Sequence, residues 1–600
     1  MAKKKSKKKK TNKSIHKLIS VLITILLIVL IVAIAFGSAI KTSIENGDEI
    51  DARWFLGLIY PDKYAYSREM ADLNEYFQII SADDVAIIVG NERIEDKGTY
   101  SGGEVYFPLS TAERLFTDRF YYNDAEGKLL YSTSTDIYTV DLNDGSSGYT
   151  YGGSFTPTEH TPAFVKGEQL YISLEYVRKF ANFDYTYYPN PNRVQVYTSW
   201  DSETVAELAK DTSVRYQGGI KSDILCKCTK GQVVTILETM ETWTKIHTSD
   251  GFTGYVENTK LGEAYAKSGT PATGAYDPMA DYGAGNPDDD IVLAWHQIYY
   301  ADQGENLNSF LDGDEGVTVV SPTWFYINSE YGTFDNYATK EYVENAHAKG
   351  YQVWALVEDM TNSKNYSEYE LFSSSSNRKM LIDNLISAVN EVGADGINVD
   401  CEYVNKETGE HFVQFLRELS IETRKNGLVL SVDNYVQNQG NLHYDLTEQG
   451  IVADYVVIMG YDEHWAGSEP GSVASIGFVE GGITAALNEG VPSSKLINGV
   501  PFYTRLYRTE GSDVSSQAIG MNEAKEWMAN RGISPEWDDA ACQYYIRFED
   551  GTAVSEMFIE DSESMEARLT MMKNYNLAGV ACWKLGLENE TIWPVIKSFY

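Results

Sequence analysis

Three features of this 600-residue sequence predict a multidomain protein that ends in an α/β barrel. Its length suits roughly three to five domains of ~100–200 residues each. Over residues 289–600, apolar strand-like segments alternate with amphipathic helical ones, which is the pattern of a parallel α/β fold. Upstream, tyrosine-rich segments with period-two alternation indicate smaller β-rich modules. We therefore predict a (β/α)₈ TIM barrel with a small α+β insertion, preceded by a small all-β barrel, an α+β stalk domain and one N-terminal transmembrane helix.

The barrel prediction rests on eight strand candidates. Helical stretches separate most of them, for example Arg378–Val392 and Glu410–Lys425. Eight parallel strands in ~300 residues fit a (β/α)₈ barrel, whose chemistry lies at the carboxyl ends of the strands. The candidates are Ile291–Ile298, Val317–Ile327, Gln352–Val357, Gly396–Glu402, Val429–Asp433, Tyr455–Met459, Leu496–Phe502 and Gly579–Leu585.

The amino terminus carries a candidate membrane span. Residues 18–40 contain no charged side chain, and as a helix they would extend ~35 Å, enough for the ~30 Å hydrocarbon core of a bilayer. A basic tail, residues 1–17, precedes this segment and acidic residues follow it. This asymmetry predicts a single-pass protein with its amino terminus inside and its body outside the cell membrane, on the wall side. A cleaved signal peptide is the alternative, because residues 37–39 are small; in both cases the body is exported.

Charge and cysteine content exclude several classes of protein. The chain has 49 basic and 87 acidic residues, a formal net charge of −38. Nine lysines lie in residues 1–17, and without them 40 basic residues face 87 acidic ones. So acidic a body repels phosphates, which excludes nucleic acid as a partner. Five cysteines are too few for a disulfide scaffold, and 43% apolar residues exclude wholesale disorder.

Residues 45–205 contain a degenerate repeat. Its copies run over 103–134 and 167–199, and each predicts a short strand, a helix and a hairpin. The hairpin turns are expected at Asn123-Asp124 and Asn190-Pro191. The pattern resembles the amino-terminal domain of copper amine oxidases, which recurs in bacterial wall proteins as a stalk. That resemblance implies a spacer or adhesion module and no copper chemistry.

Residues 213–261 predict a compact all-β unit of short strands around Gly231, Trp243 and Gly254-Tyr255-Val256. The unit resembles a bacterial Src-homology-3-like domain, a family common in wall hydrolases. Trp243 and Tyr255 either line a ligand groove or belong to the core. Residues 263–288 are rich in Gly, Ala, Pro, Ser and Asp, and we expect them to form a linker.

The strongest signal for chemistry ends the fourth strand candidate. Its residues are Asp395-Gly396-Ile397-Asn398-Val399-Asp400-Cys401-Glu402. Strand side chains alternate between faces, so Asn398, Asp400 and Glu402 should point together into the barrel mouth. A carboxylate pair at that spacing raises one pKa, which suits Glu402 to be a protonated general acid near neutral pH. The structural alternative is a solvated acidic strand end.

With this motif, residues 289–600 resemble glycoside hydrolase family 18, the chitinases and endo-β-N-acetylglucosaminidases. The family pattern is DGxDxDxE, and Asn398 stands in its second Asp position. The same replacement is familiar among spore-cortex and wall-associated members, and it removes a titratable group while it keeps hydrogen-bonding capacity. Glu402 is retained, whereas catalytically dead lectin-like relatives usually lose this acid.

Three further segments match the family at predicted strand ends. Met459-Gly460-Tyr461-Asp462 matches MxYD, residues 499–505 resemble GxPxYGR, and Trp583 closes the eighth strand candidate. Residues 508–560, with a hairpin over Tyr544–Phe558, should form the small insertion. The resemblance implies Glu402, Asp400 and Tyr461 as catalytic residues. Its substrate-binding candidates are Asn398, Trp583, Asp462, Met459, Tyr503, Arg505 and Trp324.

The resemblance also implies a substrate-assisted retaining mechanism, in which the N-acetyl oxygen of the substrate attacks. Glu402 would protonate the leaving oxygen and then act as base, Asp400 and Tyr461 would hold the acetamide, and Trp583 would form the floor under the sugar. No cofactor or metal is expected, because the eight histidines offer no close pair with ligand spacing. Cys226-Lys227-Cys228 likewise lacks the second pair of a zinc site.

The sequence thus predicts a membrane-anchored, outward-facing glycosidase that cleaves β-1,4 bonds next to N-acetylglucosamine. Peptidoglycan is the expected polymer, because the barrel follows a span, a spacer and a wall-type module. Chitin or chito-oligosaccharides are the alternative substrates. A non-catalytic carbohydrate-binding surface protein is the alternative of another class, and the retained Glu402 argues against it.

Overall fold

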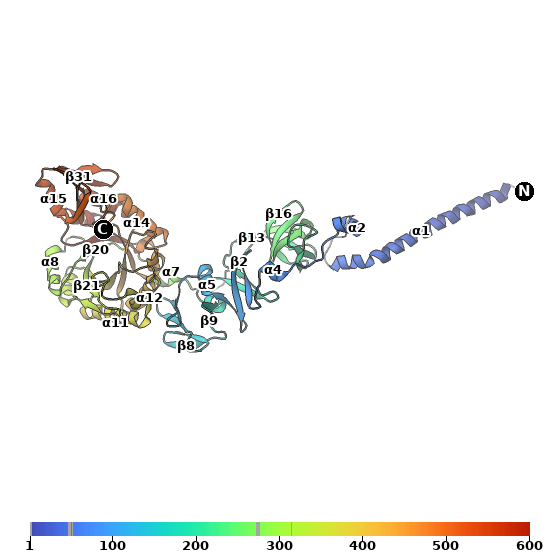
Figure 1. The fold of residues 1–600 in the computed structure, drawn as a ribbon, viewed down its shortest axis with the longest axis horizontal. Coiled ribbons are helices and arrows are strands. Elements are labelled where there is room, and N and C mark those ends of the chain that lie inside the picture. Colours follow the sequence, from blue (N-terminus) through green and yellow to red (C-terminus); the bar gives the residue numbers. More distant parts are fainter. Residues whose placement is uncertain (1–2, 46–49, 51, 272–275, 314) are drawn as a thin grey trace. The chain divides into compact units, whose positions relative to one another are not determined.

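The computed structural model describes residues 3–45, 50, 52–271, 276–313 and 315–600. Two compact units make up the chain (Figure 1). The first comprises Met1–Asp118 and Thr158–Tyr276, and the second comprises Arg119–Pro157 and Asp277–Tyr600. Each unit is therefore assembled from two separate stretches of sequence.

The first unit begins with α1 (Lys3–Glu45), a 43-residue helix that contains the predicted apolar segment. Its window His16–Ile34 has a mean hydropathy of 3.1. Among the described residues, α1 is the one helix long and apolar enough to cross a bilayer, a property that signal sequences share. Three short helices follow: α2 (Ala52–Ile59), α3 (Pro61–Tyr64) and α4 (Leu73–Phe77).

Two seven-stranded sheets form the body of the first unit. The stalk sheet has the order β11-β12-β1-β2-β3-β10-β9, and the SH3-like sheet has the order β15-β14-β18-β17-β16-β13-β19. The stalk sheet contains β1 (Asp84–Val89), β2 (Glu92–Ser101), β3 (Glu104–Pro108), β9 (Ala163–Lys166), β10 (Gln169–Ser173), β11 (Asp184–Tyr188) and β12 (Arg193–Tyr197), with α5 (Leu109–Leu115) and α6 (Leu174–Val177). The SH3-like sheet contains β13 (Ser202–Leu208), β14 (Thr212–Arg215), β15 (Ile224–Cys228), β16 (Val233–Thr239), β17 (Trp243–Thr248), β18 (Thr253–Glu257) and β19 (Leu261–Ser268).

One hydrophobic core serves both sheets of the first unit. Ala86 and Ile88 of β1 belong to the same buried cluster as Val214 and Val256 of the SH3-like sheet. Arg193 Nη2 also lies 2.9 Å from Asp250 Oδ2. The stalk and the all-β unit, which the sequence suggested as separate modules, are therefore packed together.

The expected linker over 263–288 is partly regular structure. Its first residues extend β19, which pairs antiparallel with β13 from Ser202↔Ser268 to Leu208↔Leu261. This ladder satisfies backbone groups along one side of β13. Farther on, α7 (Pro278–Tyr282) buries Tyr282. The linker prediction is wrong for these two stretches, and residues 272–275 lie outside the described residues.

Both repeat copies form the predicted strand, helix and hairpin, but their hairpins belong to different units. The second copy places β11 and β12 in the stalk sheet. The first copy places its hairpin in a five-stranded sheet of the second unit, called the docked sheet here. Its strands are β4 (Phe120–Asn123), β5 (Lys128–Ser132), β6 (Ile137–Asp141), β7 (Gly148–Tyr151) and β8 (Ser154–Pro157).

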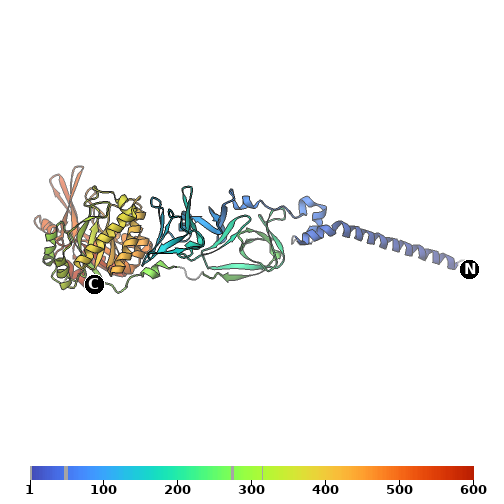
Figure 2. The ribbon, with the colours of Figure 1, turned by 90° about the horizontal axis from the view of Figure 1, so that it is seen from below.

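A closed barrel of eight parallel strands dominates the second unit (Figures 1 and 2). β20 pairs with both β21 and β33, which closes the circle. All eight predicted strands are confirmed, and each begins and ends within three residues of its expected bounds. They are β20 (Ile291–His296), β21 (Val319–Ile327), β23 (Gln352–Glu358), β24 (Gly396–Asp400), β25 (Val429–Tyr435), β26 (Tyr455–Met459), β27 (Leu496–Pro501) and β33 (Gly579–Trp583), with β22 (Phe334–Asn336) added antiparallel to β21.

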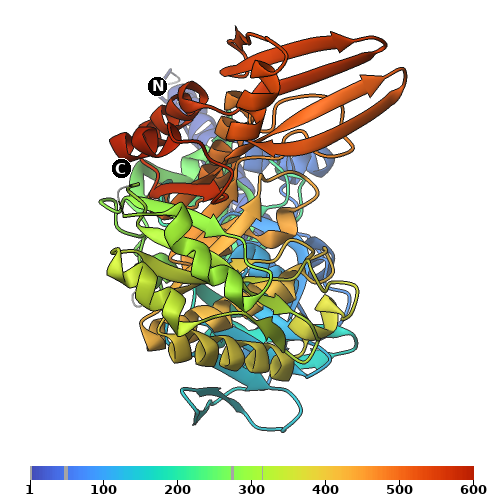
Figure 3. The same cartoon turned by 90° about the vertical axis from the view of Figure 1, so that its left-hand side faces the viewer.

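Helices surround the barrel and bury the outer faces of its strands (Figure 3). Burial on both faces explains why β24 and β27 are buried along their whole length. The helices are α8 (Leu307–Phe310), α9 (Lys340–Ala348), α10 (Glu368–Ser373), α11 (Ser375–Val392), α12 (Gly409–Asn426), α13 (Leu446–Val452), α14 (Ile476–Asn488), α16 (Ser562–Asn574) and α17 (Ile592–Phe599).

The predicted α+β insertion follows the seventh barrel strand. Its five-stranded sheet has the order β29-β28-β32-β31-β30 and a small core that includes Ile546 and Met557. The long strands, orange to red in Figure 3, project from the barrel. The elements are β28 (Tyr503–Glu510), β29 (Asp513–Gly520), α15 (Met521–Ala529), β30 (Glu536–Asp538), β31 (Gln543–Asp550) and β32 (Ala553–Ile559).

A buried ion-pair cluster holds the docked sheet against the barrel helices. Arg119 Nε lies 2.9 Å from Glu448 Oε2 of α13, and Arg417 Nε of α12 lies 2.7 Å from Glu448 Oε1. The three side chains are 4–6% exposed. Burial alone would raise the pKa of Glu448, but Arg417 and Arg119 outweigh it and hold this pKa below its ordinary value. Tyr121 of β4 adds a 2.7 Å hydrogen bond to His411 Nδ1.

Glu448→Gln should therefore destabilise the second unit strongly. The substitution keeps the shape of the side chain but leaves two buried guanidinium groups without their counter-charge, a defect worth ~3–5 kcal/mol. We expect a lower Tm for the second unit in calorimetry of the full chain. The matched control is Asp383→Asn, which breaks the exposed pair with Lys379 and should cost no more than ~1 kcal/mol. Equal Tm values for the two variants would contradict this assignment.

Candidate active site

A cavity of about 330 Å³ opens at the carboxyl ends of the barrel strands. This is the end where (β/α)₈ barrels carry their chemistry. Every lining residue belongs to the second unit. The lining comprises Trp295, Gln297, Tyr299, Thr323, Tyr326, Leu356, Glu358, Met360, Thr361, Asp400, Glu402, Asp433, Tyr435, Met459, Tyr461, Asp462 and Trp583.

The start of the acidic motif fixes β24 in place. Asp395 Oδ2 accepts hydrogen bonds from Val353 N at 2.7 Å and from His347 Nε2 at 2.8 Å. At Gly396, a Cβ atom would lie 2.8 Å from the Val429 carbonyl oxygen, which is too close for any other residue without a backbone shift. These two positions set the register of the strand and take no part in lining the cavity.

The end of the motif supplies the acids. Asp400 and Glu402 both line the cavity, while Cys401 between them is buried in the core on the other side. Asn398, two residues earlier, is fully buried beneath them. The alternation expected for this strand is therefore present, and it brings two carboxyl groups to the same opening.

Burial is the main electrostatic influence on both acids. Burial, together with the charges of Asp359, Asp433 and Asp462, raises the pKa of Glu402 to about 8. Burial also raises the pKa of Asp400 well above its ordinary value, and the charge of Glu402 adds to this increase. Glu402 is therefore mostly protonated at neutral pH. The neighbouring acids that raise the Glu402 pKa most are Asp359, Asp433 and Asp462, whereas the motif suggested Asp400.

The Asn398 side chain forms hydrogen bonds with three other side chains. Its Nδ2 donates to Asp433 Oδ1 at 2.8 Å, and its Oδ1 accepts from Trp295 Nε1 and Ser321 Oγ, both at 3.0 Å. The amide thus supplies a donor to a buried acid, which a carboxylate at position 398 would not do. Asn398 is therefore fully engaged in hydrogen bonds at the position where the DGxDxDxE pattern has Asp.

Two carboxyl oxygens of the lining residues are buried without a partner. Among the described residues, Asp400 Oδ1 and Asp433 Oδ2 are buried and have no hydrogen-bond donor. A buried polar atom without a partner costs ~1–3 kcal/mol. Both atoms are ready to accept a hydrogen bond from a ligand.

Four other sequence candidates meet at the cavity. Met459 ends β26, Tyr461 and Asp462 follow it, and Trp583 ends β33. Burial holds the pKa of Tyr461 well above its ordinary value, so its phenol keeps its proton and can donate it in a hydrogen bond. The indole of Trp583 packs edge to face on Trp295, with the ring centroids 5.8 Å apart.

Besides the buried Asn398, three sequence candidates lie outside the lining. Tyr503 is buried and donates from its hydroxyl to Asp462 Oδ1 at 2.5 Å, so it supports a lining residue. Arg505 Nη1 donates to Ser516 Oγ of the insertion at 3.3 Å. Trp324 is fully buried in the core and packs edge to face on Tyr342. The substrate-binding role suggested for Trp324 and Arg505 has no support in this geometry.

Two residues that contact Glu402 were not among the sequence candidates, and of these Tyr435 lines the cavity. Asp359 follows β23 and accepts from the backbone N–H groups of Glu402 and Tyr403 at 2.9 and 3.0 Å. Burial raises the pKa of Asp359 to about 7. Tyr435, at the end of β25, donates its hydroxyl to Glu402 Oε2. The strand-end rule could have identified these two residues, since each ends or follows a correctly predicted strand.

The described residues that could together ligate a metal ion do not belong to this cavity. Over the described ranges, one group of three or more potential ligands is close enough to share an ion, and it belongs to the first unit. The acids of the cavity do not form such a group.

Family comparisons agree with the fold and with the motif. Residues 296–588 match the family model of glycosyl hydrolases family 18, and residues 210–261 match the bacterial SH3 domain. The barrel domain thus belongs to glycosyl hydrolases family 18, and the SH3-like sheet contains a bacterial SH3 domain. The resemblance of residues 45–205 to copper amine oxidases stays a prediction.

Curated relatives align with the barrel half of the chain. The Cortical fragment-lytic enzyme of Bacillus subtilis is 27% identical over 231 residues, which cover 37% of this chain and 53% of that protein. The Uncharacterized glycosylase YvbX of the same organism is 25% identical, covering 42% and 76%. Chitotriosidase-1 of Mus musculus is 24% identical, covering 38% and 58%. The chain thus spans about half the length of two of these relatives.

A solved structure, the Bacillus cereus spore cortex-lytic enzyme SleL, is 21% identical with a TM-score of 0.48 and covers 53% of this chain and 75% of that one.

Glu402→Gln should stabilise the folded chain at alkaline pH. Between the ordinary value of 4.5 and about 8, the folded state binds more protons at Glu402 than the unfolded state does. Stability is therefore lost as the pH rises through this window, and a glutamine cannot ionise. The Tm of the variant should exceed that of wild type by a few degrees at pH 8.5 and equal it near pH 4.5. The exposed neighbour Glu407→Gln is the control, and the same gain in both variants would contradict the burial argument.

Proposed function

We propose that the barrel is a glycoside hydrolase that cleaves β-1,4 bonds next to N-acetylglucosamine. The observation that carries this proposal is the placement of Glu402, a largely buried acid that shares a cavity with Asp400, Tyr461 and Trp583. A general acid must hold its proton at working pH and reach the leaving oxygen. The pKa of Glu402, raised to about 8, meets the first condition. Its position in the cavity lining meets the second.

The first chemical step uses the acetamide of the substrate. Its oxygen attacks the anomeric carbon, the glycosidic C–O bond breaks, and the proton of Glu402 moves to the leaving oxygen. The bicyclic oxazolinium ion that forms is positively charged. Asp400 and Asp433 offer carboxyl oxygens without partners, and Asp400 Oδ1 would accept from the acetamide N–H. Tyr461 would donate to the acetamide oxygen.

The second step hydrolyses this ion. Glu402, now ionised, removes a proton from water while the water oxygen bonds to the anomeric carbon, and the acetamide is restored. Tyr435 donates to Glu402 Oε2, which favours the ionised form that this step needs. Trp583 provides an apolar surface under the sugar ring, as aromatic side chains do in carbohydrate sites.

Peptidoglycan is the substrate that we propose. Two relatives carry the names Cortical fragment-lytic enzyme and glycosylase, and the chain also contains a bacterial SH3 domain. The apolar window His16–Ile34 supports a membrane-anchored protein with its amino terminus inside, so that the barrel meets the wall outside the cell. Chitin is the second candidate, supported by the relative named Chitotriosidase-1.

Product analysis separates the two candidates. The full chain in detergent should release fragments from purified peptidoglycan with new N-acetylglucosamine reducing ends, identified by borohydride reduction and mass spectrometry. Glu402→Gln should lower kcat by ~10²–10⁴-fold, because it removes the general acid. Faster release from chitin oligomers than from peptidoglycan would favour the second candidate. Wild-type turnover by Glu402→Gln would exclude Glu402 as the acid.

The substrate-assisted mechanism makes a separate prediction. A substrate whose N-acetyl group is removed should bind but scarcely react, and a thiazoline mimic of the cyclic intermediate should bind far more tightly than substrate. Tyr461→Phe should weaken thiazoline binding by ~1–3 kcal/mol, because it removes one buried hydrogen bond. Inhibition constants measure this effect. A glycosyl ester trapped on any Asp or Glu would show that the enzyme supplies its own nucleophile.

A further inference from the structure

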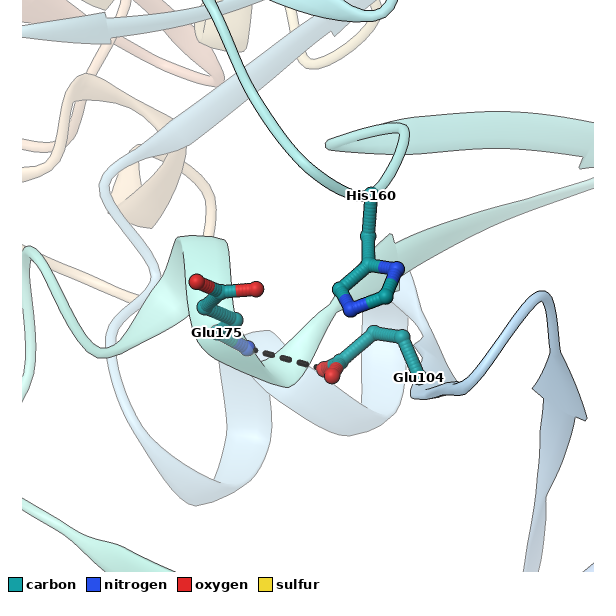
Figure 4. A group of neighbouring side chains, drawn as sticks. All are labelled: Glu104, His160 and Glu175. Atoms are coloured by element: carbon teal, nitrogen blue, oxygen red, sulfur yellow. Dashed lines mark hydrogen bonds between the residues drawn. The ribbon is translucent and has the colours of Figure 1, made fainter.

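We propose that the first unit holds a divalent-metal site formed by Glu104, His160 and Glu175, with Zn²⁺ as the ion that its donors suit best. The site is separate from the barrel and independent of the proposed hydrolase activity. One potential ligand atom from each side chain lies within 4.8 Å of the other two. Figure 4 shows the His160 ring facing the carboxyl group of Glu104, with Glu175 beside them.

Three separate segments supply these ligands. Glu104 begins β3, His160 lies between β8 and β9, and Glu175 lies in the first turn of α6. The packing makes room for the histidine, because a Cβ at Gly103 would lie 3.3 Å from His160 Cε1, tighter than an ordinary contact. Gly103 has a φ of +99°, which also favours glycine there. The chain around residues 103–104 is thus shaped to bring an imidazole against a carboxylate.

Hydrogen bonds fix the orientation of the Glu104 carboxyl group. Its side chain is buried, and Oε1 accepts from Ser173 Oγ at 3.2 Å, from Glu175 N at 3.0 Å and from Tyr185 Oη at 3.1 Å. The Tyr185 hydroxyl also lies 3.3 Å from Oε2. Metal-ligating carboxylates characteristically have such outer partners, which fix their orientation. Oε2 keeps lone-pair capacity for a further interaction.

The donor set selects the class of ion. One imidazole nitrogen with two carboxylate oxygens suits Zn²⁺, whereas Ca²⁺ and Mg²⁺ prefer oxygen ligands throughout. Around a tetrahedral Zn²⁺ with bonds of ~2.0–2.2 Å, donors lie ~3.4 Å apart. The donors here, up to 4.8 Å apart, reach that spacing if the exposed Glu175 side chain rotates inward. Water would complete the fourth position.

A bound ion would connect three segments of the first unit. Two carboxylates and a neutral imidazole carry a charge of −2, which Zn²⁺ neutralises. An ion that binds only the folded state stabilises it by mass action. The first unit should therefore unfold at a higher temperature with Zn²⁺ than after removal of metal.

The test is a zinc titration of the full chain in detergent after dialysis against EDTA. A chromogenic chelator reports the free ion, and calorimetry reports the Tm of the first unit. Wild type should bind one Zn²⁺ that is lost, or weakened at least ~100-fold, in His160→Ala and Glu175→Gln. Tyr185→Phe should weaken binding by ~10–100-fold, because it removes an outer partner of Glu104. Glu159→Gln, which changes the exposed acid next to His160, should bind like wild type.

The cysteines of β15 need a control of their own. Cys226 Sγ and Cys228 Sγ lie 3.9 Å apart and could take up zinc. Co²⁺ in place of Zn²⁺ distinguishes the sites, since thiolate ligands give intense charge-transfer absorption that nitrogen and oxygen ligands lack. We expect weak d–d bands alone, unchanged in Cys226→Ser. The proposal is overturned if wild type binds no ion, if His160→Ala binds as tightly as wild type, or if the cobalt spectrum shows thiolate bands.

Discussion

Burial of several carboxyl groups at one end of the barrel is the constraint on which the candidate active site depends. The closed barrel brings Asp400, Glu402 and Asp433 to one opening. Asp359 follows the neighbouring strand β23 and accepts a hydrogen bond from the backbone N–H of Glu402. Each is expensive to ionise there. Desolvation and the charges of neighbouring acids raise the pKa of each of these four groups. Burial of these acids lowers the free energy of unfolding, and favourable packing elsewhere in the barrel must offset this loss.

Part of that support comes from outside the barrel sequence. The docked sheet places Arg119 on Glu448 of α13, and the next residue, Gln449, exchanges hydrogen bonds with Asn434 at 2.7 and 3.0 Å. Asn434 directly follows the cavity residue Asp433. Residues 119–157 therefore belong to the folded unit that carries the site, and a fragment that begins at residue 289 would expose Glu448 and Arg417.

In the first unit, too, residues far apart in the sequence pack together and form shared features. Its two sheets share one core, and the proposed metal ligands lie at positions 104, 160 and 175. These three ligands are spread over 71 residues, so no local sequence motif could have predicted the site. The arrangement exists only because the stalk sheet places β3 beside β10, directly before α6.

The sequence by itself determined the barrel, its eight strands, the insertion, the apolar helix and the pairing of Asp400 with Glu402. The insertion was implied by the family resemblance. The other features follow from hydrophobic period and strand alternation, which are local. Only the tertiary structure decided that Asp359, Asp433 and Tyr435 join that pair, that Trp324 is core and that residues 119–157 belong with the barrel. Those outcomes depend on which strand ends meet and which face is covered, and both are set by packing between distant segments. The pKa of Glu402 is likewise decided by the tertiary structure, because desolvation depends on everything that surrounds the carboxyl group.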